Sequence, residues 1–176
     1  VICNGFKTDD YLAKISDLIN NGFENITPIL DNYRELDKLT ESIDKTFNIG
    51  IRIASEEEPK LEFYTSRLGI GYRDIIPYYS QKIAEHLNAR LKMLHFFINT
   101  GIKDTAYYWN ELYKCLRVYA RLKKIAPEVD SLNIGGGFPI KTSLNFDYDY
   151  QYMVNEIVSQ IKKFCEEEGV EEPNIY

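Results

Sequence analysis

Apolar residues along the chain follow two periods, one typical of buried strands and one typical of amphipathic helices. Short apolar runs predict strands at residues 1–3, 26–30, 49–54, 91–98, 131–134 and 173–176. Between them, apolar residues recur at three- and four-residue spacing, which predicts helices over about 8–21, 32–43, 105–126 and 148–168. One more helix, carrying Ile83 and Leu87, is expected before the strand at 91–98. Strand and helix therefore alternate along the whole chain.

Polar residues and glycines mark the ends of several predicted helices. Thr8 is a good N-cap for the first helix, and Asn21 with the following glycine stops it. Asn32 and Glu35 have the spacing of a capping box for the second helix, whose apolar stripe begins at Tyr33 and continues at 36, 39 and 43. Gly169 ends the last helix.

Five strand–helix units in succession predict an α/β protein with parallel strands. A closed barrel needs eight such units and about 250 residues, so the count indicates a partial (β/α)8 TIM-type barrel or an open sheet of five to six strands. The sequence starts and stops within predicted strands. We therefore expect residues 1–176 to form a single partial barrel domain cut from a longer chain.

Composition and charge exclude several classes of protein. The 176 residues include 21 Lys plus Arg and 27 Asp plus Glu, for a net charge of −6, and 44% of them are hydrophobic. This share of apolar residues excludes a disordered chain, and the acidic balance argues against a nucleic-acid partner. Apolar runs are all far shorter than the roughly 18 residues that span a bilayer. We expect a cytoplasmic protein without a membrane partner.

Cysteine and histidine are too few for disulfide or metal chemistry. The three cysteines, at 3, 115 and 165, are far apart, and the two histidines are at 86 and 95. An odd, sparse set of cysteines is typical of reduced thiols. Zinc hydrolase chemistry is therefore disfavoured, and no metal ligand is predicted.

Arg52 is unusual because it lies in the middle of a predicted buried strand. Alternation places Ile49, Ile51 and Ile53 on one face of the strand and Arg52 on the other. A buried guanidinium is costly unless its charge is paired. The residues leave two interpretations open, a structural ion pair with a neighbouring strand or an anion contact in a pocket above the strand ends.

Three consecutive glycines, Gly135, Gly136 and Gly137, follow the predicted strand at 131–134. Glycine lets backbone N–H groups approach an anion closely, and phosphate sites at strand C-termini are common in barrels and open α/β sheets. A flexible loop is the alternative. Neither a Walker loop nor a Gly-x-Gly-x-x-Gly dinucleotide motif is present, which disfavours nucleotide kinases and Rossmann dehydrogenases.

The strand at 91–98 carries a polar and aromatic face. Period-two alternation places His95, Phe97 and Asn99 together, which suits the wall of a pocket. A lone strand histidine is, however, more often a hydrogen-bonded core residue than a catalyst, so both interpretations of His95 stay open.

These segments, taken in chain order, resemble the fold-type III pyridoxal-phosphate (PLP) decarboxylases, and within them the biosynthetic arginine decarboxylases. Residues 1–7, followed by acidic residues and Tyr11, are similar to the third barrel strand of arginine decarboxylases and its loop. Arg52 resembles the fifth-strand arginine. Residues 66–69 stand where the family has Ser-Lys-Phe-Gly. Residues 132–137 resemble the Asp-x-Gly-Gly-Gly segment, with Asn133 in the Asp position.

The resemblance implies barrel strands 3 to 7 and the start of strand 8. It implies that Gly135, Gly136 and Gly137 hold the cofactor phosphate and that Arg52 lies in the cofactor site. The lysine that forms the Schiff base is expected before Val1, and the carboxylate for the pyridine nitrogen is expected after Tyr176. We therefore predict no catalytic residue within the chain and no decarboxylase activity of the chain by itself.

The sixth strand departs from the family pattern. His-x-Gly-Ser usually stands there, with the histidine on the cofactor ring and the serine at the phosphate, whereas residues 97–100 are Phe-Ile-Asn-Thr. Phe97 can still stack on the ring and Thr100 keeps a hydroxyl, but a titratable group is lost. His95 lies on the same face, one layer deeper. We count His95, Phe97 and Thr100 among the cofactor-binding residues that the resemblance implies.

Two classes of function follow. The first is part of a PLP-dependent arginine decarboxylase that makes agmatine for polyamine and spermidine biosynthesis. The second is a decarboxylase-like barrel that lost catalysis and acts as a regulator or PLP-binding module. Diaminopimelate and carboxynorspermidine decarboxylases are the nearest rival enzymes. By resemblance alone, the parent enzyme would act on arginine, form a homo-oligomer and use Mg²⁺ beside PLP.

Overall fold

The computed structural model describes residues 1–55, 68–98, 101–141 and 146–176. The elements follow the predicted alternation closely. In chain order they are β1 (Ile2–Cys3), α1 (Asp9–Asn20), β2 (Thr27–Leu30), α2 (Arg34–Ser42), β3 (Phe47–Ala54), β4 (Ile70–Gly71), α3 (Ile75–Gln81), the 3₁₀ helix η1 (Ile83–Glu85), β5 (Ala89–Phe96), α4 (Ala106–Ile125), β6 (Ser131–Asn133), α5 (Tyr150–Glu168) and β7 (Asn174–Ile175).

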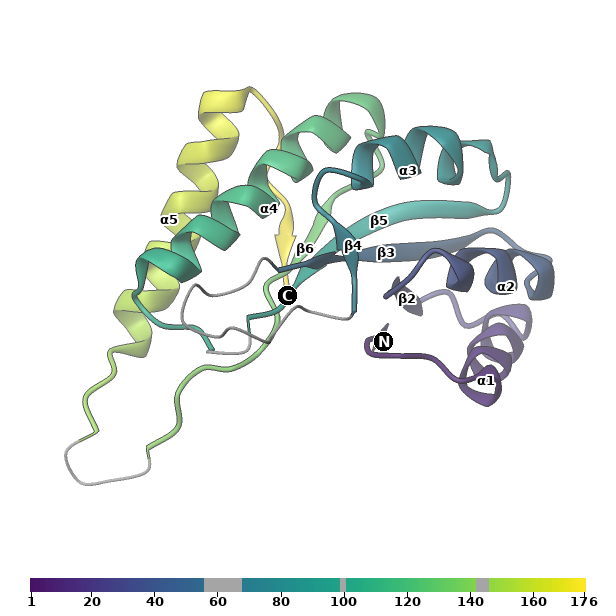
Figure 1. The fold of residues 1–176 in the computed structure, drawn as a ribbon, viewed down its shortest axis with the longest axis horizontal. Helices are drawn as coiled ribbons and strands as arrows, with labels where there is room; N and C mark the ends of the chain where they lie inside the picture. The colour runs from purple at the N-terminus through teal and green to yellow at the C-terminus, as the bar shows by residue number, and fades with distance from the viewer. Residues whose placement is uncertain (56–67, 99–100, 142–145) are drawn as a thin grey trace.

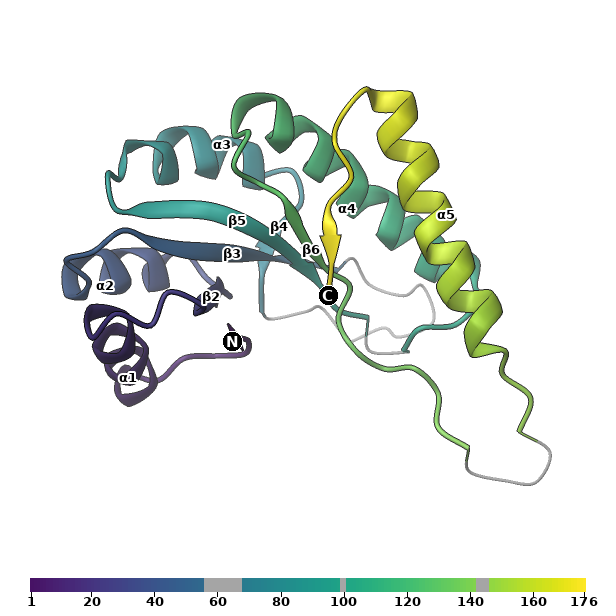
Figure 2. The ribbon, with the colours of Figure 1, turned by 180° about the vertical axis from the view of Figure 1, so that it is seen from behind.

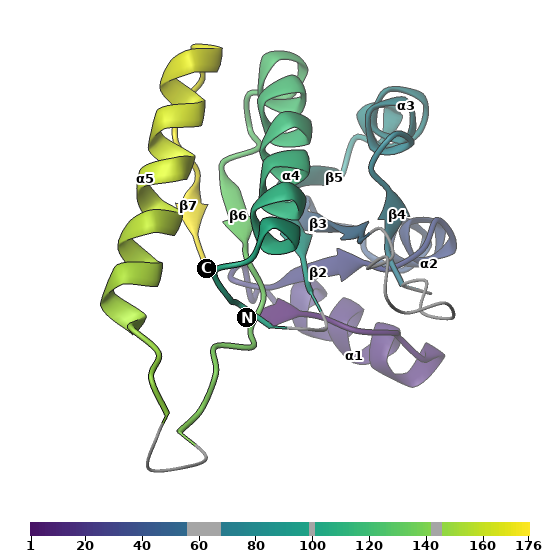
Figure 3. The same ribbon diagram turned by 60° about the vertical axis from the view of Figure 1, so that its left-hand side comes forward.

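All strands pair in parallel in a single sheet whose order is β1-β2-β3-β5-β6-β7. The short strand β4, which the sequence did not predict, pairs beside the end of β3. Because the order along the sheet is the order along the chain, the sheet has no point at which its winding reverses, as a doubly wound sheet would have. The sheet curls, and the α-helices of the described residues, α1 to α5, cover its outer side (Figure 1, Figure 3). This arrangement confirms the partial barrel.

Both chain ends continue the edge strands of the sheet: the Val1 carbonyl oxygen accepts a hydrogen bond from the Thr27 N–H, and the Tyr176 N–H donates to the Leu132 carbonyl oxygen (Figure 2). The first helix, α1, starts at the predicted N-cap, where the Thr8 side chain accepts a hydrogen bond from the Tyr11 backbone N–H. The last helix, α5, ends at Gly169, which has the left-handed φ of 64°. No helix of the described residues is long and apolar enough to cross a membrane.

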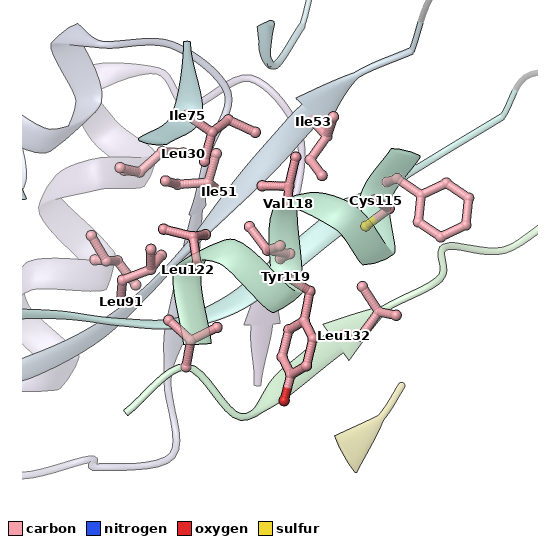
Figure 4. Packing of buried hydrophobic residues seen from close by; sticks show 14 of the residues in the cluster. Leu30, Ile51, Ile53, Ile75, Leu91, Cys115, Val118, Tyr119, Leu122 and Leu132 are labelled. Atoms are coloured by element: carbon pink, nitrogen blue, oxygen red, sulfur yellow. The ribbon is translucent and has the colours of Figure 1, made fainter. Parts of the chain in front are cut away.

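The core lies between the sheet and the helices. Ile49, Ile51 and Ile53 are buried on the helix-facing side of β3, as alternation predicts. Side chains of α4, among them Val118 and Leu122, pack close to this face (Figure 4). Burying an aliphatic side chain of this size contributes about 1.5–3 kcal/mol. Burial of the three isoleucines therefore determines which side of β3 faces the helices.

Two expectations about apolar positions were wrong. The predicted helix through Leu87 ends earlier, because α3 stops at Gln81 and η1 ends at Glu85. Leu87 therefore lies in the connection to β5 and is 98% exposed. Tyr33, the expected start of the apolar stripe of α2, is about half exposed and contacts the ring of Tyr78 edge-on.

The expected capping box of α2 is replaced by a different arrangement. Asn32 Oδ1 accepts a hydrogen bond from the Arg34 backbone N–H, and Asn32 Nδ2 donates one to Oε1 of the buried Glu35 at 3.0 Å. Its Oε2 lies 3.0 Å from Lys7 Nζ and accepts a hydrogen bond from the Asp31 backbone N–H. Glu35 therefore joins the loops after β1 and β2.

Candidate cofactor-binding site

Four polar residues form a row across the inner face of the sheet, which we call the polar row: Asp31, Arg52, His95 and Asn133. Pairing of Leu30 with Ile51 brings Asp31, the residue after β2, beside Arg52. Arg52 pairs with His95, and His95 pairs with Asn133. Because these residues alternate with the helix-facing apolar side chains, their side chains point into the half-barrel.

Arg52 forms an ion pair and is still partly exposed. Its Nη1 lies 3.8 Å from Asp31 Oδ1, and its side chain is 14% exposed. The guanidinium carbon lies 5.6 Å from the centre of the Phe97 ring, within the range of a cation–π contact. The geometry thus contains the ion pair with a neighbouring strand and also places the guanidinium on the face that a bound ligand would use.

Several buried polar atoms of the row have no hydrogen-bond partner among the described residues. They are both carboxylate oxygens of Asp31, Nε of Arg52 and Nδ1 of His95. Burial raises the pKa of the Asp31 carboxyl, and the charges of Lys7 and Arg52 oppose this effect. Buried polar groups in native proteins normally find a partner, so this face has unused capacity for a polar ligand or for water.

His95 is neutral at pH 7. It is 4% exposed, and burial lowers its pKa to about 4, although contact with Asn133 acts in the opposite direction. The positive charges of Arg52 and Lys7 lower the pKa further. His95 therefore serves as an uncharged polar group within the row.

Gly135, Gly136 and Gly137 form a loop at the C-terminal end of β6, which we call the glycine loop. It packs tightly on the end of β5 and the loop that follows it. Gly135 has a φ of 73°, and a Cβ there would lie 2.8 Å from the Phe96 carbonyl oxygen. Gly101 has a φ of 80°, and a Cβ there would lie 2.5 Å from the Gly137 carbonyl oxygen. That oxygen accepts a hydrogen bond from the Ile102 N–H at 3.0 Å. Glycine is required at these positions by the close contact of two backbones.

Gly136 differs from its neighbours because it borders open space. A Cβ built on it would meet no atom of the described chain within 4 Å. Asn133 Oδ1 accepts a hydrogen bond from the Gly135 N–H at 2.8 Å, which fixes the turn that presents Gly136. The loop thus has a rigid base and an open surface of bare backbone, as a phosphate cradle needs. The residues present fit the phosphate of PLP.

Phe97 joins the glycine loop to the polar row. A Cβ on Gly135 would lie 3.4 Å from Phe97 Cδ2, and the Phe97 ring also faces Arg52. An aromatic ring therefore stands beside the cradle, where a cofactor ring can stack. Thr100 lies outside the described residues, as do Ser66 and Arg67 of the matched family segment.

The sequence did not predict that three polar residues, Lys7, Asp31 and Glu35, lie next to this site. Lys7 is 3% exposed, and its Nζ donates to the carbonyl oxygens of Gly5 and Ile29 as well as to Glu35. Asp31 is 1% exposed. The position of Asp31 directly after an apolar strand was an available signal, because strand C-termini carry functional groups in barrels. Lys7 and Glu35 are 28 residues apart, and no local pattern predicts their pairing.

Within the described part of the chain, no cluster of three potential metal ligands occurs.

The fold defines the class of protein: a domain built on consecutive strands of an α/β barrel, with a glycine loop at the C-terminal end of β6. Residues 1–176 match the family model described as pyridoxal-dependent decarboxylase, pyridoxal binding domain. The chain belongs to this family of pyridoxal-dependent decarboxylases.

Individual relatives agree with this assignment. The biosynthetic arginine decarboxylase of Geotalea uraniireducens is 30% identical over 192 residues, which cover 99% of this chain and 30% of that protein. The crystal structure of the biosynthetic arginine decarboxylase from Campylobacter jejuni has a TM-score of 0.75 at 23% identity, covering 99% of this chain and 29% of that one. Diaminopimelate decarboxylase from M. jannaschi has a TM-score of 0.78 at 22% identity, covering 99% and 41%. Both structures support the fold alone.

The chain spans about 30% of the length of the curated relatives it matches.

Proposed function

We propose that this chain is the cofactor-holding part of a PLP-dependent decarboxylase that converts arginine to agmatine and CO₂. The observation that carries the proposal is the open, bare-backbone surface at Gly136 in a domain of the pyridoxal-dependent decarboxylase family. Arginine is proposed because the chain matches biosynthetic arginine decarboxylases over 99% of its length. A role in polyamine biosynthesis, a cytoplasmic location, a homo-oligomer and Mg²⁺ belong to the same proposal.

The proposal assigns a task to each group of residues. Gly135, Gly136 and Gly137 bind the cofactor phosphate, and Phe97 stacks beside the cofactor ring, with Arg52 next to it. Bound PLP supplies an electron sink that weakens the bond between Cα and the carboxylate of an amino acid. His95 stays neutral and so adds no positive charge beside the guanidinium of Arg52. Thr100 is assigned to the phosphate by the resemblance only.

The substrate is tested in the full-length protein. We expect a larger kcat/KM for release of CO₂ from arginine than from ornithine, lysine or diaminopimelate, because kcat/KM measures discrimination between substrates. A larger kcat/KM for any of the other three would contradict the arginine assignment and leave the cofactor site in place. Carboxynorspermidine is included as a fifth substrate for the same reason.

A second candidate function is a PLP-binding or regulatory domain without catalysis. The observation that favours it is Phe97, which stands where the family usually has a titratable histidine. Full-length protein that binds PLP but releases no CO₂ from any of the five substrates would establish this alternative.

A further inference from the structure

A basic concave surface lies on the outer, helical side of the half-barrel, and we call it the α4 basic pocket. It has a volume of about 410 Å³. Its lining residues are Tyr72 and Arg73 after β4, Lys114, Arg117, Val118 and Arg121 of α4, and Glu168 at the end of α5. It shares no described lining residue with the polar row or the glycine loop.

The charge of this pocket is opposite to that of the chain. Four cationic side chains line it against the single carboxylate of Glu168, whereas the chain as a whole has a net charge of −6. Glu168 is already bound, since its Oε2 lies 3.0 Å from Lys124 Nζ. A concave surface of one sign concentrates ions of the other sign. The ligand that fits this pocket is therefore an anion.

Arg117 and Arg121 are the groups that a ligand can reach. They are exposed and stand one helical turn apart on α4, where like charges disfavour the helix. Neither makes an ion pair with a carboxylate among the described residues. Lys114, by contrast, is held 2.8 Å from Glu111 and 5.8 Å from the centre of the Tyr72 ring. Within the part of the chain that the structure describes, the two guanidinium groups thus have no carboxylate counter-ion, whereas the neighbouring Lys114 side chain is held in place.

We propose that the α4 basic pocket binds a small phosphate-bearing molecule, with Arg117 and Arg121 on its phosphate groups and Tyr72 beside the remainder. The planar fork of arginine matches phosphate oxygens in pairs. The volume of about 410 Å³ is within the range of small-molecule sites, and concavity favours such a ligand over an extended macromolecule. The proposal is independent of the decarboxylase function.

The test is an isothermal calorimetric titration of the 176-residue chain at 0.1 M salt, with ATP in one series and pyrophosphate in another. Arg117→Gln/Arg121→Gln should weaken binding of both probes at least tenfold. Lys162→Gln/Lys163→Gln on the exposed part of neighbouring α5 is the matched control, because it removes the same charge outside the pocket, and it should change affinity less than twofold. Gly136→Val should leave this binding intact, which separates the pocket from the cofactor cradle. Circular dichroism verifies that each variant is folded.

Each remaining outcome contradicts the proposal. Failure of both probes to bind the folded wild-type chain would overturn it. Equal losses in the two double variants would show a general charge effect in place of a site. Loss of binding in Gly136→Val would place the anion at the glycine loop. Tighter binding of single-stranded RNA than of ATP would replace the small ligand by a macromolecule.

Discussion

Gly135 and Gly136 are neighbours with opposite requirements for a side chain. Gly135 has a φ of 73° and no room for a Cβ, whereas Gly136 has an ordinary φ and open space around it. We predict that Gly135→Ala lowers the free energy of unfolding by about 1–3 kcal/mol, as strained positions do. Gly136→Ala should change it by less than about 0.5 kcal/mol. Urea unfolding of both variants checks this, and equal effects would contradict the different roles of the two glycines.

His95 makes stability depend on pH in a defined window. Its pKa is about 4 in the folded chain and about 6.5 when unfolded, so the unfolded state binds the extra proton first. The contribution of neutral His95 is therefore complete above pH 6.5 and is lost as pH falls towards 4, by up to about 1.4 kcal/mol per pH unit. Asp31, with its raised pKa, has the opposite trend.

Comparison with a variant isolates this effect. The free energy of unfolding of wild type minus that of His95→Gln should fall between pH 6.5 and pH 4.5, as measured by urea denaturation. Asn133→Asp should reduce the fall, because a carboxylate beside His95 raises its pKa. A difference that is independent of pH would contradict a buried neutral His95.

At the scale of elements, the pair of Lys7 and Glu35 fixes the loops after β1 and β2. Both side chains are almost fully buried and their charged atoms lie 3.0 Å apart. Glu35→Gln leaves the lysine charge buried and unpaired, for which we predict a loss of about 3–5 kcal/mol in the free energy of unfolding. Lys38→Gln, which breaks an exposed pair with Asp9, should cost less than about 1 kcal/mol. Equal and small losses in thermal or urea unfolding would contradict the role of the buried pair.

The elements themselves were largely predictable because they depend on local patterns. Apolar periodicity located the long helices α4 and α5 and six of the seven strands described in the sheet, and the caps at Thr8 and Gly169 are local too. Leu87 was misplaced because periodicity does not reveal where a helix breaks. Contacts between distant residues were not predictable, which is why β4 and the pairing of Lys7 with Glu35 were missed.

The candidate site was predictable to the extent that it follows strand alternation. Arg52 and His95 were placed on the inner face by the period of two, and pairing of the strands brings them side by side. Asp31 as the ion-pair partner of Arg52 depends on register between β2 and β3, which the sequence does not encode locally. The role of these residues in cofactor binding stays a prediction.

At the largest scale, the described residues form a curled sheet whose two edges pair with no further described strand. β1 and β7 form the two ends of the strand order, and the inner face carries the polar row. Unpaired strand edges associate readily with other strands. We predict that the isolated 176-residue chain self-associates, so that its mass by sedimentation rises with concentration between about 1 and 100 µM. A monomer of constant mass that binds little hydrophobic dye would contradict this prediction.

The central claim is that the glycine loop holds the phosphate of PLP, and Gly136→Val tests it most directly. A valine side chain fills the open space in which we place the anion. The positive-φ backbone at Gly135 and Gly137 is left unchanged. The measurement is the dissociation constant for PLP, by absorbance titration of the full-length protein, beside the free energy of unfolding without PLP. We predict that PLP binding weakens at least tenfold while stability changes by less than about 1 kcal/mol. Unchanged PLP binding, or a loss of binding matched by an equal loss of stability, would contradict the claim.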